Sequence, residues 1–98
     1  MPIQDTIQSY LDNEDEKLSY LAKEIWDHPE IGLQETFASN LLSTEAEAAG
    51  FSVKRGVGQM PTAFVASWGQ GKPIIGILGE YDALPGLSQQ VEATIEAV

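Results

Sequence analysis

An apolar run that ends in two acidic residues, at residues 74–89, constrains the fold of this chain more than any other feature. Its sequence is Ile-Ile-Gly-Ile-Leu-Gly-Glu-Tyr-Asp-Ala-Leu-Pro-Gly-Leu-Ser-Gln. Residues 74–78 are typical of a strand that is covered on both faces, because such strands are almost continuously apolar. Acidic side chains at the carboxyl end of a buried strand lie where open α/β sheets usually bind ligands. The run therefore predicts an α/β fold with a candidate site at one edge of its sheet.

Two helices are predicted before this run. Residues 4–27 form an amphipathic helix, which ends at Asp27-His28-Pro29 because a residue before proline is disfavoured in the helical region. Its apolar face is expected to carry Ile3, Ile7, Leu11, Leu18, Leu21 and Ile25. A second helix is expected over residues 34–49, followed by Gly50 in the left-handed conformation that often ends helices.

Two short strands are predicted between the second helix and the apolar run. Residues 51–57 alternate apolar and polar side chains, as half-buried strands do, and Gly56 and Gly58 are expected to break this strand up. Residues 62–68 form the better strand, with bulky side chains at Phe64, Val65 and Trp68. With residues 74–78, the expected order is two helices and then three strands, an α/β fragment whose sheet is incomplete. Residues 89–98 have mild helical character and no stop signal.

Composition excludes several classes of protein. The chain has 98 residues, enough for one domain at most, and a net charge of −10 that argues against nucleic-acid and anionic-membrane partners. It has no cysteine, hence no disulfide, thiolate nucleophile or sulfur-rich metal site. No secretory signal or apolar stretch of about 20 residues is visible, so a cytoplasmic protein is expected.

The larger aromatic residues are expected in the core, since no basic groove accompanies them. They are Trp26, Phe37, Phe51, Phe64 and Trp68.

Glu80 and Asp82 are the first candidate site residues. In an extended chain, side chains two positions apart point to the same side, so both carboxylates could face one site. Paired carboxylates commonly serve acid–base chemistry or metal binding. The alternative is that one carboxylate caps the following turn by accepting hydrogen bonds from its backbone amides.

His28 and Glu35 are expected to have structural roles. His28 is the single histidine of the chain, and a catalytic zinc ion usually takes three protein ligands. At the end of a helix, a histidine can instead bond the terminal carbonyls. Glu35 is expected to be a favourable negative charge in the first turn of the second helix.

Four segments, in order, resemble the amidohydrolases of the aminoacylase and carboxypeptidase family of metallopeptidases. They are Ile-Trp-Asp-His-Pro-Glu-Ile-Gly-Leu-Gln-Glu at 25–35, Gly-Phe-Ser-Val at 50–53, Pro-Thr-Ala-Phe-Val-Ala at 61–66 and Gly-Glu-Tyr-Asp-Ala-Leu-Pro-Gly-Leu-Ser-Gln at 79–89. The last segment most resembles the aminobenzoyl-glutamate hydrolase branch. The resemblance implies that residues 1–98 are the N-terminal portion of a three-layer α/β catalytic domain of the zinc-exopeptidase kind, without the lid or dimerisation domain.

The same resemblance implies hydrolysis of the amide bond of N-acyl amino acids or aminobenzoyl-glutamate-like substrates. Family members use two bridged divalent cations, zinc or manganese, and the full-length parent is expected to bind them and to form a homodimer. The position of Asp82 is that of a carboxylate that supports a metal ligand, while relatives carry a carboxylate or a histidine at the position of Glu80. The other metal-binding segments of the family have no counterpart in this chain, so alone it is expected to bind no metal and to be inactive.

A different class of function fits the same residues. A small acidic α/β module without catalytic activity could bind a partner protein through the open edge of its short sheet, because unpaired strands invite such pairing.

Overall fold

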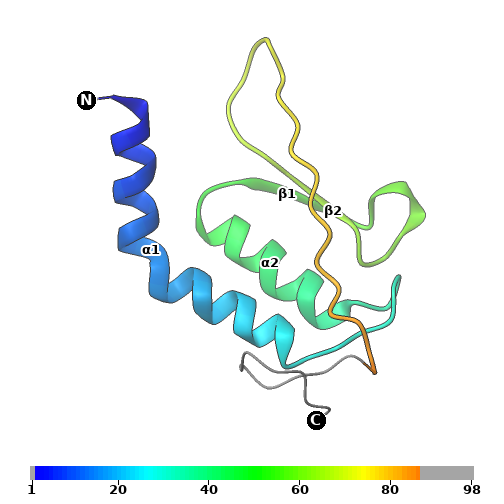
Figure 1. Cartoon of the computed structure of the whole chain (residues 1–98). Coiled ribbons are helices and arrows are strands. Elements are labelled where there is room, and N and C mark those ends of the chain that lie inside the picture. The colour runs from blue at the N-terminus through cyan, green and yellow to red at the C-terminus, as the bar shows by residue number, and fades with distance from the viewer. Residues whose placement is uncertain (1, 87–98) are drawn as a thin grey trace.

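The computed structural model describes residues 2–86, which form two helices followed by a β-hairpin (Figure 1). The elements are α1 (Ile3–Trp26), α2 (Thr36–Ala48), β1 (Ser52–Arg55), the 3-10 helix η1 (Val57–Gln59) and β2 (Phe64–Ser67). The predicted α/β class is confirmed, and both helices lie close to their predicted ranges. The segment predicted to be helical at residues 89–98 lies outside the described residues.

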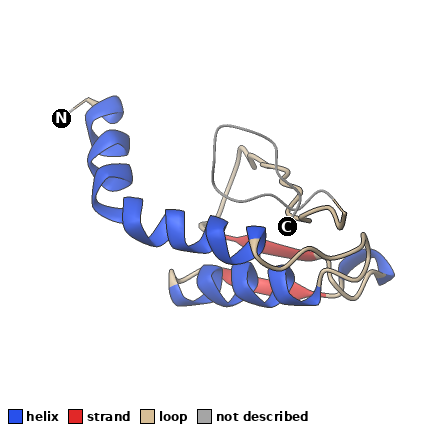
Figure 2. Cartoon of the chain, turned by 60° about the horizontal axis from the view of Figure 1, so that its bottom comes forward, coloured by secondary structure: helices blue, strands red, loops and turns tan. Residues whose placement is uncertain are grey.

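Helix α1 bends near its middle, so that its N-terminal half extends away from the rest of the molecule (Figures 1 and 2). The C-terminal half lies beside α2, where Leu21 is buried and Lys17 forms an ion pair with Glu45 of α2. Near the other end of the predicted apolar face, Ile3 and Ile7 are exposed. The amphipathic pattern therefore continues beyond the part of α1 that has a packing partner among the described residues.

Helix α2 packs against α1 and both strands through small side chains. Ala38, Ser39 and Ser43 are its buried residues, and Ser43 has no exposed surface. Small side chains allow the helix to approach its neighbours closely. Gly50 follows α2 with φ +98°, as predicted, and a Cβ atom there would lie 2.9 Å from Cζ3 of Trp68.

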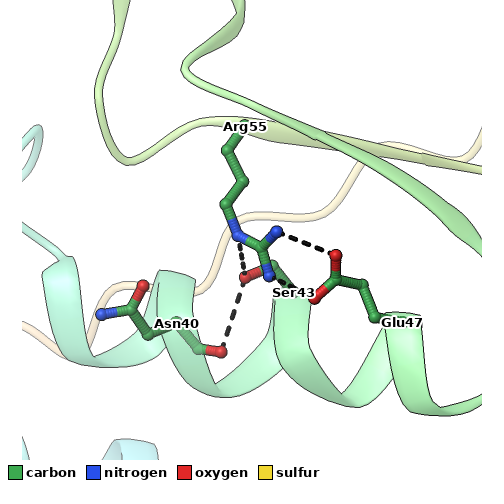
Figure 3. Close-up of polar contacts among 4 residues, drawn as sticks. All are labelled: Asn40, Ser43, Glu47 and Arg55. Atoms are coloured by element: carbon green, nitrogen blue, oxygen red, sulfur yellow. Dashed lines mark hydrogen bonds and ion pairs between the residues drawn. The ribbon is translucent and has the colours of Figure 1, made fainter.

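A polar cluster joins α2 to β1 (Figure 3). Arg55 donates hydrogen bonds from Nη1 and Nη2 to the two carboxylate oxygens of Glu47, at 3.0 and 2.8 Å, and from Nε to Oγ of Ser43 at 3.1 Å. Ser43 in turn donates to the carbonyl oxygen of Asn40. The hydrogen bonds from Arg55 lower the pKa of Glu47 and correspondingly raise that of Arg55, so both groups stay charged near neutral pH.

Strands β1 and β2 pair in antiparallel register, with Val53 opposite Ala66 and Arg55 opposite Phe64. The first strand covers less than residues 51–57, and it ends directly before Gly56, where an interruption is predicted. Gly56 has φ +71°, which turns the backbone out of the ladder, and Val57 begins η1 instead of continuing the strand.

The prediction of a third strand at residues 74–78 is wrong for the described structure. The segment runs extended past the hairpin (yellow to orange in Figure 1), but it joins no ladder, and the sheet formed by the described residues has two strands. Its four large apolar side chains are 83–96% exposed. A strand covered on both faces needs neighbouring strands and covering layers, and residues 2–86 do not supply them.

The prediction that the large aromatic residues form the core is also wrong for three of them. Trp68, Trp26 and Phe51 are 71%, 45% and 39% exposed, while Phe37 and Phe64 are half-buried. The rings of Phe51 and Trp68 lie against each other with centroids 5.6 Å apart. A two-stranded sheet covered on one side by a helix leaves too little interior for five large rings.

Candidate functional site

Glu80 and Asp82 lie at the carboxyl end of the extended segment, and both are exposed. Neither carboxylate makes a hydrogen bond or an ion pair with another residue in the range 2–86. The alternative role, in which one of them caps the following turn, therefore has no supporting hydrogen bond up to Gly86. Both side chains are available to groups outside the described part of the chain.

The residues on either side of Asp82 are held against the body of the molecule. Tyr81 donates a hydrogen bond from its hydroxyl to the carbonyl oxygen of Thr62, and its ring stacks on Phe64 with centroids 6.1 Å apart. The carbonyl oxygen of Ala83 accepts a hydrogen bond from the backbone N–H of Glu30 at 2.9 Å. Asp82 thus stands between two anchored neighbours.

Thr62 connects this segment to the start of α2. It is 5% exposed, and its hydroxyl donates a hydrogen bond to Oε1 of Glu35 at 2.9 Å. Glu35 is the N-cap residue of α2, but its side chain makes no capping hydrogen bond. The predicted first-turn charge is therefore one residue before the helix, and its carboxylate is used for a contact between segments.

Glu30 performs the capping of α2, a role that sequence reasoning missed. Its carboxylate accepts hydrogen bonds from the backbone N–H groups of Phe37 and Ala38, at 2.9 and 3.1 Å, and from the hydroxyl of Thr36. The first N–H groups of a helix have no partner within the helix, and a negative charge near them is favourable. Capping residues normally sit directly before the helix, so no standard sequence signal identifies a cap from position 30.

His28 has the structural role predicted for it. Nδ1 lies 2.7 Å from the carbonyl oxygen of Glu24, near the end of α1, and the ring stacks on Phe37 with centroids 3.7 Å apart. Because a carbonyl oxygen can only accept, Nδ1 donates this hydrogen bond. The histidine thereby joins the end of α1 to the first turn of α2.

Metal-binding side chains do not cluster in the described structure. Within residues 2–86, no three His, Cys, Asp or Glu side chains are grouped closely enough to hold a metal ion. Catalytic zinc usually needs three protein ligands besides water, and Glu80 and Asp82 offer two carboxylates at most. These residues alone do not fit a complete catalytic metal site.

Three of the four segments that carry the family resemblance meet at this site. Residues 25–35, 61–66 and 79–86 are far apart in the chain, and the contacts of Glu30, Glu35, Thr62 and Tyr81 bring them together. No model of a known protein family matches the sequence.

Comparison with known proteins finds two related enzymes. The chain is 49% identical over 84 residues to one of the subunits of p-aminobenzoyl-glutamate hydrolase from Escherichia coli (strain K12), an alignment that covers 86% of this chain. The resemblance to the aminobenzoyl-glutamate hydrolase branch is therefore confirmed over most of this chain. The chain is also 35% identical over 91 aligned residues to human Xaa-Arg dipeptidase, an alignment that covers 79% of the chain.

Each of these two alignments covers most of this chain but a small part of the relative. The chain spans 18% of the length of the bacterial hydrolase subunit and 21% of that of the human dipeptidase. None of the helices within residues 2–86 is long and apolar enough to cross a membrane.

Proposed function

We propose that this chain is part of a metal-dependent amidohydrolase that cleaves the amide bond of N-acyl amino acids or aminobenzoyl-glutamate-like substrates. The observation that carries the proposal is the 49% identity to the p-aminobenzoyl-glutamate hydrolase of Escherichia coli over 86% of the chain. The bacterial relative is named for an acylated amino acid and the human relative for a dipeptide, and both compounds contain an amide bond to the amino group of an amino acid. Amide hydrolysis is therefore the chemistry common to the two names.

Residues 1–98 are proposed as the N-terminal portion of the catalytic domain. Two divalent metal ions, zinc or manganese, would polarise the substrate carbonyl and activate water in the complete enzyme. Most of their ligands would come from outside the described residues. The contribution of this chain would be Asp82, which would orient a metal ligand through a hydrogen bond, with Glu80 beside it.

Several properties of the complete protein follow from this proposal. Its partners would be small acylated amino acids, in the cytoplasm, and the complete enzyme would form a homodimer. The net charge of −10 disfavours nucleic acid and anionic membranes as partners. By itself, the chain would not catalyse hydrolysis, because nearly all groups that hold the metal ions would be missing.

A chimeric enzyme tests the proposed function. In it, this chain replaces the matching 84 residues of the bacterial hydrolase, and hydrolysis of p-aminobenzoyl-glutamate is measured with and without a chelator. We expect chelator-sensitive hydrolysis, and we expect Asp82→Asn to lower kcat/KM by about 10- to 100-fold, the usual effect of losing a group that orients a metal ligand. Asp15→Asn, which changes an exposed acid of α1, is the matched control.

Two outcomes would contradict the proposal. One is a folded chimera that hydrolyses nothing; the other is an Asp82→Asn variant as active as its control. Separately, the 98-residue chain alone should show neither chelator-sensitive hydrolysis nor tight stoichiometric binding of zinc in calorimetric titration.

An acidic binding module is the second candidate function, and the exposure of Ile77 and Leu78 favours it. These side chains are 96% and 95% exposed on an extended segment that has no strand partner among the described residues. Such a segment can add to the sheet of another protein. A stable monomer would support the module, whereas a chain that self-associates through this segment would support the amidohydrolase portion.

A further inference from the structure

The side of the extended segment on which Asp82 lies is decided by its two neighbours. Successive side chains of an extended chain point to opposite sides. Tyr81 and Ala83 are half-buried, whereas Glu80 and Asp82 are exposed. Burying Tyr81 against the body therefore directs both carboxylates outward, and a shift by one residue would turn them inward.

Thr62 contacts Tyr81 through its backbone and α2 through its side chain. Its backbone carbonyl accepts the hydrogen bond from the Tyr81 hydroxyl, and its side-chain hydroxyl donates to Glu35 at the start of α2. The position of Tyr81 is thus linked to α2 through one buried residue. Among the described residues, no buried side-chain nitrogen or oxygen lacks a hydrogen-bond partner, so this link is complete.

A second connection acts on the other side of Asp82. The N–H of Glu30 donates to the carbonyl of Ala83, while the carboxylate of Glu30 caps the first turn of α2. Both connections therefore lead to the N-terminal end of the same helix. The backbone at residue 82 is held from two sides, and the carboxylate is left without a partner within residues 2–86.

We propose that Glu35, Thr62 and Tyr81 are positioning residues that fix the direction of the Asp82 carboxylate. The chemistry that this carboxylate would support rests on the proposed function, but the positioning itself is a property of this chain. If the three residues only stabilised the fold, their loss would loosen α2 and the hairpin at least as much as residue 82. If they position Asp82, the loss of order that follows their replacement is concentrated at residues 81–83.

Removal of the Tyr81 hydroxyl tests the proposal by NMR of the ¹⁵N-labelled 98-residue chain. Tyr81→Phe removes the hydrogen bond to Thr62 and keeps the ring that stacks on Phe64. We expect the order parameter of the Asp82 amide to fall from a rigid value of about 0.85 to below about 0.6. Hydrogen exchange of the Glu30 N–H should become about 10-fold faster, because local opening of its bond to Ala83 becomes easier, and the order parameters of α2 should not change.

Matched variants separate positioning from general stabilisation. Tyr10→Phe removes a hydroxyl from an exposed tyrosine of α1 and should change nothing at residue 82. Thr62→Ser and Glu35→Gln keep the donor and acceptor atoms of the link and should preserve the rigid value, whereas Thr62→Val should lower it.

Three results would overturn the proposal. The first is an Asp82 amide that is already mobile in the unchanged chain. The second is an order parameter that Tyr81→Phe leaves unchanged, and the third is a loss of order spread equally over α2 and the hairpin. None of these measurements involves catalysis, so failure of the chimera with an ordered Asp82 would reject the proposed function alone.

Discussion

At the scale of single residues, the backbone geometry of Gly50 allows close contact with a neighbouring ring. Gly50 ends α2 with φ +98°, a conformation that residues with a Cβ atom rarely adopt. The adjacent Trp68 ring occupies the space that a Cβ atom would need, at 2.9 Å. The aromatic ring lies there because the glycine leaves room for it, although most of the ring faces solvent.

Replacing this glycine should therefore destabilise the chain. For Gly50→Ala we expect a loss of about 1–2 kcal/mol in the free energy of unfolding, from the left-handed backbone, together with a displaced Trp68 ring. Urea unfolding followed by tryptophan fluorescence measures both effects. Gly32→Ala is the control, because Gly32 has no heavy atom within 4 Å of an added Cβ atom and no positive φ. Equal stability of the two variants would contradict the prediction.

At the scale of elements, polar contacts that span the chain hold α2 in place. Glu30 caps its first turn, Glu35 binds Thr62, and Glu47 near its end pairs with Arg55 of β1 (Figure 3). Its fully buried side chains are small, and its larger apolar side chains Phe37, Leu41 and Leu42 are half-buried. Polar contacts to other segments therefore act together with apolar packing to set the position of this helix.

The pair between Glu47 and Arg55 should make stability depend on pH in the acid range. The hydrogen bonds from Arg55 lower the pKa of Glu47 below its ordinary value of 4.5 in the folded chain. The carboxylate therefore contributes stability above pH 4.5, and the contribution is lost as the pH falls through the lowered pKa of the folded state. Because both partners are exposed, the effect should be small and sensitive to salt.

Thermal unfolding of Glu47→Gln at two pH values tests this dependence. We expect the variant to melt slightly below the unchanged chain at pH 7, and the difference to vanish at an acid pH at which the carboxylate of the unchanged chain is protonated. Asp15→Asn, at an exposed site of α1, serves as the reference for a lost surface charge. A difference of equal size at both pH values would show that Glu47 acts through something other than its charge.

At the scale of the whole molecule, large apolar side chains of the described residues are exposed in several places, and two stretches carry several of them each. One is the N-terminal half of α1, and the other is the extended segment at residues 74–78. Large contiguous apolar patches on a soluble chain usually mark contacts with other protein surfaces. Both places are consistent with a chain that spans about a fifth of its relatives, since those relatives contain much more protein that could cover them.

The 98-residue chain should therefore self-associate through the extended segment. Sedimentation velocity should show association that increases with salt, because salt screens the repulsion between chains that each carry a net charge of −10. Ile77→Ser with Leu78→Ser should reduce it strongly, since both side chains are almost fully exposed and their replacement leaves the fold intact. Leu33→Ser, at an exposed site in the turn before α2, is the control. Unchanged association of the double variant would locate the contact elsewhere.

The sequence alone was sufficient to predict features that depend on residues close together along the chain. The helical spacing of apolar residues and Pro29 located α1, the glycine at position 50 was correctly expected after α2, and the role of His28 at the end of a helix was predicted. The family resemblance also came from short linear segments. Each of these features depends on interactions within a few residues along the chain, which the order of side chains specifies directly.

Tertiary structure alone decided which distant segments meet. Nothing in the sequence indicated that Glu30 would cap α2, that Thr62 would join Glu35 to Tyr81, or that residues 74–78 would lie without a strand partner among the described residues. A hydrogen bond between remote residues requires the chain to be closed into a particular geometry, and a strand requires partners that lie outside its own sequence. The local sequence pattern specifies which secondary structure a segment can form, and the rest of the fold determines whether the segment has the partners that this structure requires.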